Sequence, residues 1–548
     1  MSSLVNLFRN LRRKPARPQR TVDERVRDIR ALVERCEYSA ARVLAESLVE
    51  EAPDSADAVH MLGLAAYGLS DASTAFDCFS RAIALFPDEP VLHNNLGSVL
   101  NLLGQPAEAR SSFRKALALD PSLHAARANL IYTVIMLADE SPESICAEHI
   151  AWAEMHAEPL KAQIFPFDNV PESGRRLRIG YVSADFRVHA LTIFMDPVFD
   201  YYDRNRFEVY CYYNNAYRSS DEMTESIRRR INGFREITDL DDDAAASLIR
   251  SDGIDILVDL SGHLRNNRLL LFARKPAPVQ MTYLAYPGTT GMSTVDYRIT
   301  DALSDPPGKN DHHYREKLLR IPGCLWCFRP PTGMPEVSVL PALRNGHVTF
   351  GCTNAIIKVT DRMLTLWAQI LHAVPNSRLV FATVPPRGRE RVIKVLTENG
   401  IGEERFRMVD RLPRDQFWAL YGDIDIMLDT FPCNGGTTTC EALWLGVPAI
   451  TLVGNAFQSR AGYSLLTGIG LGEFVADSEA DYVKKTVVLA ADLKQMGQIR
   501  ESLRARMTAS PLLDGPGFTR NLEALYRDAW RSWCLSVKSG PESASRSS

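Results

Sequence analysis

The stretch Asn434-Gly435-Gly436-Thr437-Thr438-Thr439-Cys440-Glu441 defines a strand–turn–helix unit in this chain. The apolar run from Ile424 to Phe431 precedes it and predicts a buried parallel strand, and Ala442 to Leu445 predict the body of a helix. The glycines let a ligand approach the backbone closely, and three consecutive threonines favour a helix cap over a helix interior. Free N–H groups at a helix N-terminus attract anions, so the unit predicts a nucleotide-diphosphate pocket.

Glu441 falls in the first turn of the predicted helix, where a carboxylate can accept hydrogen bonds from ribose hydroxyls. The alternative interpretation of the whole stretch is an ordinary capped helix that follows a strand and binds nothing.

The bulk composition excludes several classes of protein. A chain of 548 residues predicts three to four domains, and a net charge of -4 provides no basic field for nucleic acid. No apolar run reaches the roughly 18 residues of a transmembrane segment, and no signal peptide is visible. The 10 cysteines are scattered, which favours a reducing cytoplasmic setting. Cys324 and Cys327 form a CxxC pair without a matching second pair, so core residues are favoured over a zinc or redox site.

Both ends of the chain predict disordered tails. Residues 1–21 carry six basic residues and are expected to form a solvated tail, with a phosphate- or membrane-surface arm as the alternative. Residues 536–548 are rich in serine.

An internal repeat dominates residues 22–135. Several small, aromatic and proline positions recur 34 residues apart, namely Gly63/Gly97, Ala75/Ala109, Phe79/Phe113, Ala82/Ala116 and Pro87/Pro121. This period is that of the tetratricopeptide repeat, in which helix pairs bury their apolar faces by stacking on their neighbours. We predict an α-helical solenoid of three repeats and a partial fourth, followed by a helical connector over residues 136–175.

Asn95 and Asn129 occupy the same repeat position, and Asn94 lies beside one of them. A row of asparagines on the concave face could pair with the amides of an extended peptide. A plain solvent-exposed polar face is the alternative.

The period then changes to alternating strands and helices. Residues 176–345 and 346–535 each contain a series of continuous apolar strands separated by helical patterns. Such α/β units predict two doubly wound, Rossmann-like lobes in tandem, with ligands bound at the carboxyl ends of the strands.

Candidate catalytic side chains follow strands in both lobes. In the first lobe, His189 follows strand 177–183 and His263 follows strand 254–260, and each is expected to face the cleft as a base or a hydrogen-bond donor. In the second lobe, Lys358 follows strand 348–352 and could neutralise a departing diphosphate. Each could also be an ordinary loop or surface residue. Asp425 enters a buried strand, so we interpret it as structural and expect no metal site there.

Three motifs stand out beside the repeats: Ile179-Gly-Tyr-Val-Ser-Ala-Asp-Phe186 with His189, Ala285-Tyr-Pro-Gly-Thr-Thr-Gly291, and Asp429-Thr-Phe-Pro-Cys-Asn-Gly-Gly-Thr-Thr-Thr-Cys-Glu441. Together with the repeats, they resemble the protein O-GlcNAc transferase family, including its bacterial and Spindly-like members. The resemblance extends from residue 22 to about residue 535. It implies a GT-B fold, an inverting mechanism without a metal or other cofactor, and transfer of GlcNAc from UDP-GlcNAc to Ser/Thr hydroxyls of acceptor proteins.

The resemblance also implies roles for individual residues. It makes His189 a base or an acceptor-site organiser, and Lys358 the residue that supports the leaving diphosphate. His263, Asn95 and Asn129 are the candidates for the acceptor side of the cleft. The expected donor-binding residues are Leu412, Arg414, Asn434, Gly435, Gly436, Thr437, Thr438, Thr439 and Glu441.

The sequence departs from the family pattern at Ala355, Arg414 and Phe417, where members commonly carry Asn or Gln, Lys, and His. Three other functions therefore stay open: a protein O-fucosyltransferase that uses GDP-fucose, a non-catalytic repeat scaffold with a decayed transferase, and a transferase that builds small molecules or glycans.

Overall fold

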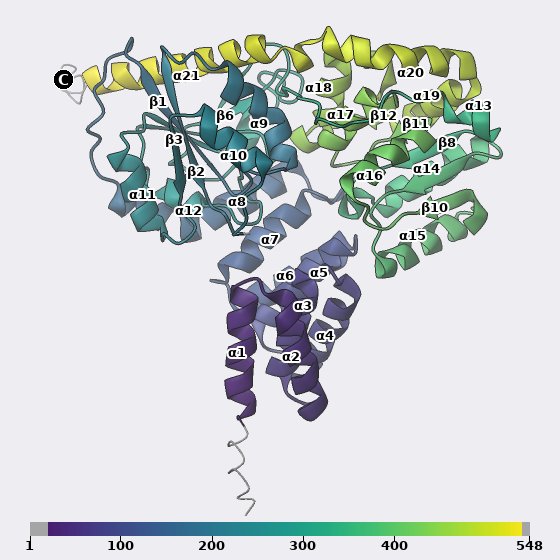
Figure 1. The fold of residues 1–548 in the computed structure, drawn as a ribbon, viewed down its shortest axis with the longest axis horizontal. Helices are drawn as coiled ribbons and strands as arrows, with labels where there is room; N and C mark the ends of the chain where they lie inside the picture. The colour runs from purple at the N-terminus through teal and green to yellow at the C-terminus, as the bar shows by residue number, and fades with distance from the viewer. Residues whose placement is uncertain (1–19, 217, 540–548) are drawn as a thin grey trace, which may run out of the picture.

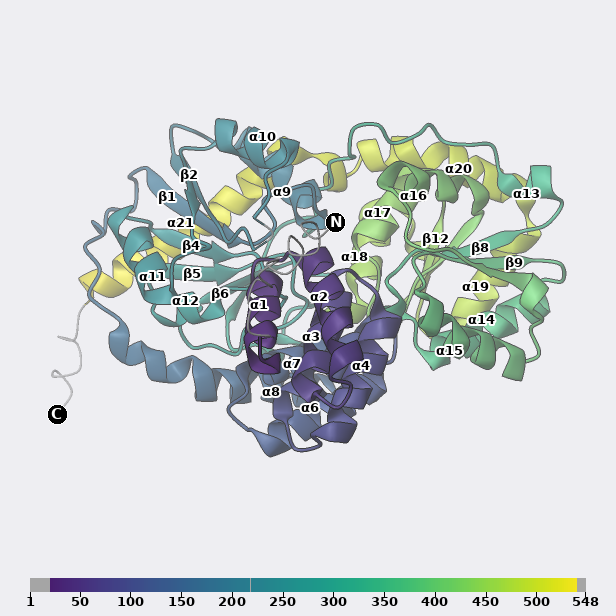
Figure 2. The same ribbon diagram turned by 60° about the horizontal axis from the view of Figure 1, so that its bottom comes forward.

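A computed structural model describes residues 20–216 and 218–539. The predicted tails at 1–21 and 536–548 therefore lie largely outside the described residues. Figure 1 shows a helical array, drawn in purple and blue, joined to two α/β lobes. Figure 2 shows, from a second direction, that the array lies beneath the boundary between the lobes.

The array consists of three helix pairs and a seventh helix, which confirms the predicted repeat solenoid. The physical cause of the period is close packing between paired helices. A Cβ atom on Gly63 would lie 2.6 Å from Cε1 of Phe79, and one on Gly97 would lie 2.6 Å from Cε1 of Phe113. The helices are α1 Val22–Glu34, α2 Tyr38–Glu51, α3 Ala56–Gly68, α4 Ala72–Leu85, α5 Pro90–Leu102, α6 Pro106–Leu119 and α7 His124–Val134.

The first lobe is built on a parallel seven-stranded sheet of order β3-β2-β1-β4-β5-β6-β7. The predicted doubly wound topology is confirmed, and β3 is a strand that the sequence analysis missed. The strands are β1 Leu177–Ser183, β2 Phe207–Tyr213, β3 Gly233–Glu236, β4 Ile256–Asp259, β5 Val279–Thr282, β6 Tyr297–Thr300 and β7 Lys317–Arg320. The helices of this region are α8 Pro142–His156, η1 Glu158–Gln163, α9 Ala190–Tyr201, α10 Glu222–Arg230, α11 Asp242–Ser251, α12 Leu269–Ala273 and η2 Asp311–His313.

The second lobe has a parallel six-stranded sheet of order β10-β9-β8-β11-β12-β13. The strands are β8 Thr349–Cys352, β9 Arg378–Phe381, β10 Phe406–Met408, β11 Ile426–Leu428, β12 Ala449–Leu452 and β13 Val475–Ala476. The helical segments of this region are α13 Pro341–Asn345, η3 Ile356–Lys358, α14 Asp361–Ala373, α15 Pro386–Glu398, η4 Glu403–Arg405, α16 Arg414–Leu420, η5 Tyr421–Asp423, α17 Thr437–Trp444, η6 Phe457–Ser459, α18 Ala461–Gly468, η7 Gly472–Phe474, α19 Glu479–Ala491, α20 Leu493–Thr508 and η8 Pro511–Leu513.

The predicted domain boundary at 346–535 places the last helix, α21 (Gly515–Lys538), in the second lobe. In the structure this helix packs on the first lobe instead. It contacts α9 and β5 of the first lobe, and Figure 1 shows it in yellow along that lobe. The Tyr526 and Tyr181 hydroxyls lie 3.1 Å apart, and Arg527 donates to the carbonyl of Arg175. The helix also continues through Lys538, beyond the predicted start of the tail at 536.

The connector 136–175 joins the array to the first lobe through a shared core. Helix α8 begins it, and Trp152, Ala153 and Ile145 of α8 pack in one cluster with residues of α7 and of the first lobe. Nε2 of buried His149 lies 2.7 Å from the Tyr286 hydroxyl. The array and the first lobe are therefore held together by buried contacts and not by a loose linker.

Within the described ranges, none of the helices is both long enough and apolar enough to cross a bilayer.

Candidate active site

The turn after β11 is folded around a buried aspartate. One carboxylate oxygen of Asp429 accepts from the backbone N–H of Gly435 at 2.7 Å and of Thr430 at 2.8 Å, and the other accepts from the Thr451 hydroxyl at 2.8 Å. Burial raises the pKa of Asp429, while these hydrogen bonds oppose the rise. Asp429 thus holds the glycine turn against the end of the sheet.

Two of the predicted donor-binding residues shape this turn through their own hydrogen bonds. The Asn434 side chain donates to the Thr430 carbonyl at 2.8 Å and accepts from the Gly462 N–H at 3.3 Å. The Gly435 N–H is occupied by Asp429. A Cβ atom on Gly435 would lie 2.5 Å from Oγ1 of Thr439, so the turn needs glycine there.

Helix α17 begins with an uncapped end. Gly436 is its N-cap residue and makes no side-chain cap, and the first helical bond runs from the Cys440 N–H to the Gly436 carbonyl at 3.0 Å. Within the described residues, the N–H groups of Thr437, Thr438 and Thr439 therefore have no backbone or side-chain acceptor. The Thr438 hydroxyl donates to Oδ1 of Asn354 at 2.5 Å, which fixes its side chain. Free amides and the helix dipole make this end suited to an anion.

Lys358 stands beside this helix end. It closes η3, directly after β8, and its ammonium donates to the Asn434 carbonyl at 2.8 Å. Lys358, Gly436 and Thr437 line the same cavity. The structure thus brings the cation and the open amides together, as the sequence analysis predicts.

The cavity at this point lies between the lobes and the array. It encloses about 970 Å³, open solvent included, and its wall is mainly apolar. A second cavity of about 1250 Å³ adjoins it, and His189, Ala190 and Thr437 line both. Together they form one cleft, and the open end of α17 at Thr437 lies where the two cavities adjoin.

The second cavity contains the residues that are predicted to bind the nucleobase and the ribose of the donor. Leu412, Arg414 and Glu441 line it, with Phe417 and Trp418. Oε1 of Glu441 accepts from Nε1 of Trp418 at 3.1 Å, and the Arg414 guanidinium stacks on the Trp418 ring, 4.7 Å from its centroid. Burial raises the pKa of Glu441, and the Trp418 hydrogen bond and the Arg414 charge oppose the rise.

His189 is the N-cap residue of α9. Its Nδ1 accepts from the Leu191 N–H at 3.3 Å and lies 3.8 Å from Oδ2 of Asp185. Burial lowers the pKa of His189, which favours the neutral ring. A neutral ring that accepts at Nδ1 carries its proton on Nε2, so this arrangement favours His189 as a hydrogen-bond donor at Nε2.

His263 does not face the cleft, contrary to the expectation for a residue at a strand end. It is 3% exposed, its Nε2 lies 3.0 Å from the Thr290 carbonyl, and its ring packs 4.6 Å from that of Trp152. Its neighbour Leu264 lines the cleft instead. The predicted position of His263 is wrong because helix α8 covers this strand end. No pattern in the sequence indicates where α8 packs.

The asparagines of the array bond to one another and to neighbouring side chains. Nδ2 of Asn129 donates to Oδ1 of Asn94 at 2.9 Å, and Nδ2 of Asn95 lies 2.8 Å from Nε2 of His60. Asn95 and Asn129 are half-buried, whereas Asn94 is buried. The predicted row exists, but a bound peptide would have to share or replace these hydrogen bonds.

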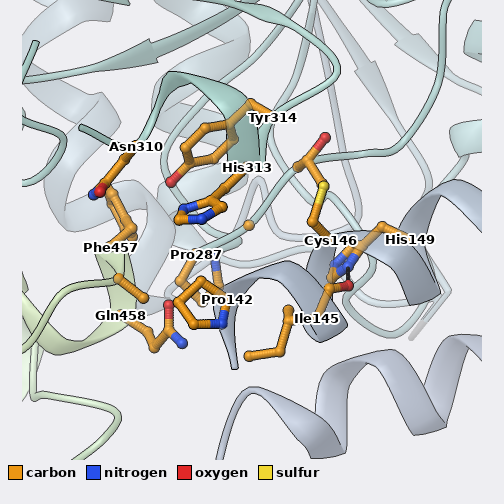
Figure 3. Close-up of a pocket in the computed structure, with 13 residues that line it drawn as sticks. Pro142, Ile145, Cys146, His149, Pro287, Asn310, His313, Tyr314, Phe457 and Gln458 are labelled. Carbon is orange, nitrogen blue, oxygen red and sulfur yellow. Dashed lines mark hydrogen bonds between the residues drawn. The ribbon is translucent and has the colours of Figure 1, made fainter. Parts of the chain in front are cut away.

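A smaller hollow of about 350 Å³ adjoins the cleft, where α8 and the two lobes meet (Figure 3). Pro287, Phe457 and Gln458 belong to the walls of both spaces. At its rim, Glu143, His312 and His313 place their ligand atoms within 4.8 Å of one another, outside the residues that line the cleft. Nε2 of His313 lies 3.0 Å from Oε1 of Glu143.

The remaining metal or redox candidates have structural roles. Cys324 and Cys327 are free and buried, and burial raises the pKa of each thiol to about 12. Asp425 accepts from the N–H groups of Ala342 at 2.9 Å and of Thr349 at 2.8 Å, so it secures the start of the second lobe as expected.

Several cleft residues escaped the sequence analysis because they come from distant segments. They are Tyr132 and Met136 at the end of the array, Trp326 before the second lobe, and Phe457 and Gln458 after β12. Buried Asn354, which accepts from the Thr438 hydroxyl, also escaped, although it lies between β8 and Lys358 and could have been found there.

A helical repeat array joined to two Rossmann-like lobes, with a helix N-terminus and a lysine in the cleft between them, defines a repeat-bearing glycosyltransferase fold. The family model for glycosyl transferase family 41 matches residues 120–327 and 340–522, and the tetratricopeptide repeat model matches residues 29–90 and 60–124. The chain belongs to glycosyl transferase family 41.

Individual relatives agree with this placement. The chain is 38% identical over 433 residues to a probable UDP-N-acetylglucosamine–peptide N-acetylglucosaminyltransferase SPINDLY of Oryza sativa subsp. japonica, covering 77% of this chain and 46% of that protein. It is 33% identical over 370 residues to the corresponding SEC protein of Arabidopsis thaliana, covering 66% of this chain and 38% of that protein. The chain thus spans less than half the length of these curated relatives.

A solved structure is similar over nearly the whole chain. A mutant of Thermobaculum terrenum O-GlcNAc transferase superposes with a TM-score of 0.88 at 36% identity, covering 94% of this chain and 98% of that chain.

Proposed function

We propose that this protein is an inverting glycosyltransferase that moves N-acetylglucosamine from UDP-GlcNAc to serine or threonine hydroxyls of acceptor proteins. One observation carries the proposal: Lys358, Gly436 and Thr437 line one cavity between the lobes, at the end of α17 where the first amides are open. The names of the SPINDLY, SEC and Thermobaculum relatives support the sugar and the peptide acceptor.

In the proposed complex the donor spans both cavities of the cleft. Its diphosphate occupies the end of α17 at Gly436, Thr437 and Thr438, and Glu441 accepts from the ribose. The base lies toward Leu412 and Arg414. As the sugar leaves, negative charge grows on the phosphate oxygen, and Lys358 and the helix dipole stabilise it.

The acceptor hydroxyl attacks the anomeric carbon from the face opposite the diphosphate, which inverts the configuration. His189 lines both cavities and, as a donor at Nε2, would position the reacting groups. The repeat array, with Asn95 and Asn129 on its row of asparagines, supplies the surface that binds the acceptor protein.

We propose that no metal ion takes part in the transfer. Lys358 and the amides of α17 already offer positive charge where the leaving group forms.

All 10 cysteines are free, which supports the expected reducing, cytoplasmic setting.

The test is direct transfer to proteins. Purified protein is incubated with a cell extract and either UDP-GlcNAc or GDP-fucose, and modified serine and threonine residues are identified by mass spectrometry. We expect HexNAc with UDP-GlcNAc, and none when Lys358→Ala replaces the wild type. If only GDP-fucose supports transfer, and the added group is a deoxyhexose, then GDP-fucose and not UDP-GlcNAc is the donor. If neither donor supports transfer, the proposed function is overturned.

A further inference from the structure

The last helix of the repeat array forms part of the cleft wall. Tyr132 and Met136, one turn apart on and just after α7, line the same cavity as Lys358 and Gly436. Met136 packs with Ile357 and Cys433 of the second lobe, and the Tyr132 ring packs against this cluster. The array therefore contributes side chains directly to the space where the sugar would be transferred.

The Tyr132 hydroxyl is a polar group in a largely apolar setting. Burial and the nearby Cys433 thiol raise the pKa of Tyr132 to about 12, so the phenol keeps its proton and can donate. In the part of the chain that the structure describes, no hydrogen bond satisfies this hydroxyl. Tyr132 is half-buried in the cavity wall, so this hydroxyl is available to donate to a substrate group that enters the cleft.

The position of Tyr132 points to the acceptor and not to the donor nucleotide. One turn earlier on the same helix, Asn129 joins the asparagine row through Asn94 and Ser98. The base and ribose region lies in the other cavity, at Arg414 and Glu441, where Tyr132 takes no part. Tyr132 thus belongs both to the helix that carries Asn129 and to the wall of the cavity that Lys358 lines.

We infer that Tyr132 is an acceptor-positioning residue, whose phenol O–H donates a hydrogen bond to a backbone carbonyl of the acceptor chain beside the modified serine or threonine. This inference rests on the proposed function. Helix α7 then has two roles. Asn129 belongs to the row of asparagines that binds the acceptor, and Tyr132 sets the depth at which the acceptor enters the cleft.

The experiment uses Tyr132→Phe, which removes only the hydroxyl, in the full-length protein. The probe is a synthetic peptide library with one central serine in random sequence, and transfer is followed with labelled UDP-GlcNAc. We expect the apparent KM for the library to rise by about 5- to 30-fold, as for loss of one hydrogen bond, with kcat changed less than about 3-fold. The affinity for UDP and the slow hydrolysis of UDP-GlcNAc without peptide should stay at wild-type values.

Tyr201→Phe is the matched control, because Tyr201 is exposed at the far end of α9. It should leave every parameter unchanged. The inference is overturned if Tyr132→Phe keeps the wild-type KM, or if it weakens UDP binding or donor hydrolysis as strongly as transfer, since the hydroxyl would then contact the donor.

Binding of the fluorescein-labelled library in the presence of UDP, measured by anisotropy, separates this inference from the proposed function. If the wild type transfers no sugar, the proposed function fails. Weaker peptide binding by Tyr132→Phe would then still support the role of Tyr132, and equal binding would reject it.

Discussion

The ammonium of Lys358 lies 2.8 Å from the backbone carbonyl oxygen of Asn434, although 76 residues separate them in sequence. This hydrogen bond ties the end of η3 to the turn that opens α17. The cation is thereby held beside the free amides before any ligand binds, and such preorganisation is the main source of electrostatic stabilisation in enzymes.

Replacement of this lysine tests the arrangement. Lys358→Ala should lower kcat by about 100- to 1000-fold, because one preorganised cation is lost where the leaving charge develops. Circular dichroism and the thermal midpoint should stay close to wild type. Lys394→Ala is the control, since Lys394 is 72% exposed on α15 and should be dispensable. A Lys358→Ala enzyme with more than a tenth of wild-type activity would contradict the assigned role.

The glycine turn offers a steric test. Gly435→Ala would place a Cβ atom 2.8 Å from Oδ1 of Asn354 and 2.9 Å from Oγ1 of Thr438, and so would disrupt the hydrogen bond between them. We expect UDP affinity, measured by calorimetry, to fall at least 10-fold.

Gly497→Ala is the opposite case, because nothing lies within 4 Å of its Cβ position inside α20. It should stabilise the protein by about 0.5–1 kcal/mol, since alanine is the better helix former, and leave UDP binding intact. Equal UDP affinity in both glycine variants would reject the role of the turn.

Glu441 is expected to bind the ribose of the nucleotide. Glu441→Ala should weaken UDP binding by about 10-fold or more, because a charged hydrogen bond is lost and the Trp418 N–H loses its acceptor. Inorganic pyrophosphate, which has no ribose, should bind both proteins equally. A parallel loss of pyrophosphate binding would show that the substitution damages the helix end itself.

The buried junction between the array and the first lobe predicts a loss of stability in acid. Burial lowers the pKa of His149 from 6.5 to about 4, so the unfolded chain takes up this proton at higher pH than the folded chain. The contribution of the neutral His149 ring to the free energy of unfolding is full above pH 6.5 and is lost as the pH falls toward 4. It amounts to about 2 kcal/mol between pH 7 and pH 5.

Denaturant unfolding at pH 7 and pH 5 measures this difference. His149→Gln should shrink it by about 2 kcal/mol, whereas His372→Gln, at an exposed position, should not. An unchanged pH dependence in His149→Gln would show that other groups carry the effect.

The proposal that no metal ion takes part in the transfer is also testable. Transfer from UDP-GlcNAc should proceed at an unchanged rate in EDTA, because Lys358 and the α17 amides serve the diphosphate. The variant Lys358→Ala in the presence of Mg²⁺ is the companion measurement, and it should stay inactive. A rate that falls in EDTA and returns with a divalent cation would require a metal in the mechanism.

The sequence predicted well wherever the signal was local. The repeat array follows from glycine and phenylalanine pairs that touch within one repeat, such as Gly63 and Phe79. Long apolar strands were found to within one to three residues. The missed strands, β3 and β13, are short, and β3 carries Arg235 and Glu236 among its four residues, so no apolar pattern marked it.

By itself, the sequence determined the order of array and lobes and the residues of the turn that we propose binds the diphosphate, because periodicity, glycines and threonines act over a few neighbouring positions. Only the tertiary structure decided that α21 returns to the first lobe, that α8 buries His263, and that α7 brings Tyr132 into the cleft. These outcomes depend on which apolar surfaces cover one another across more than a hundred residues, and no local pattern records that choice.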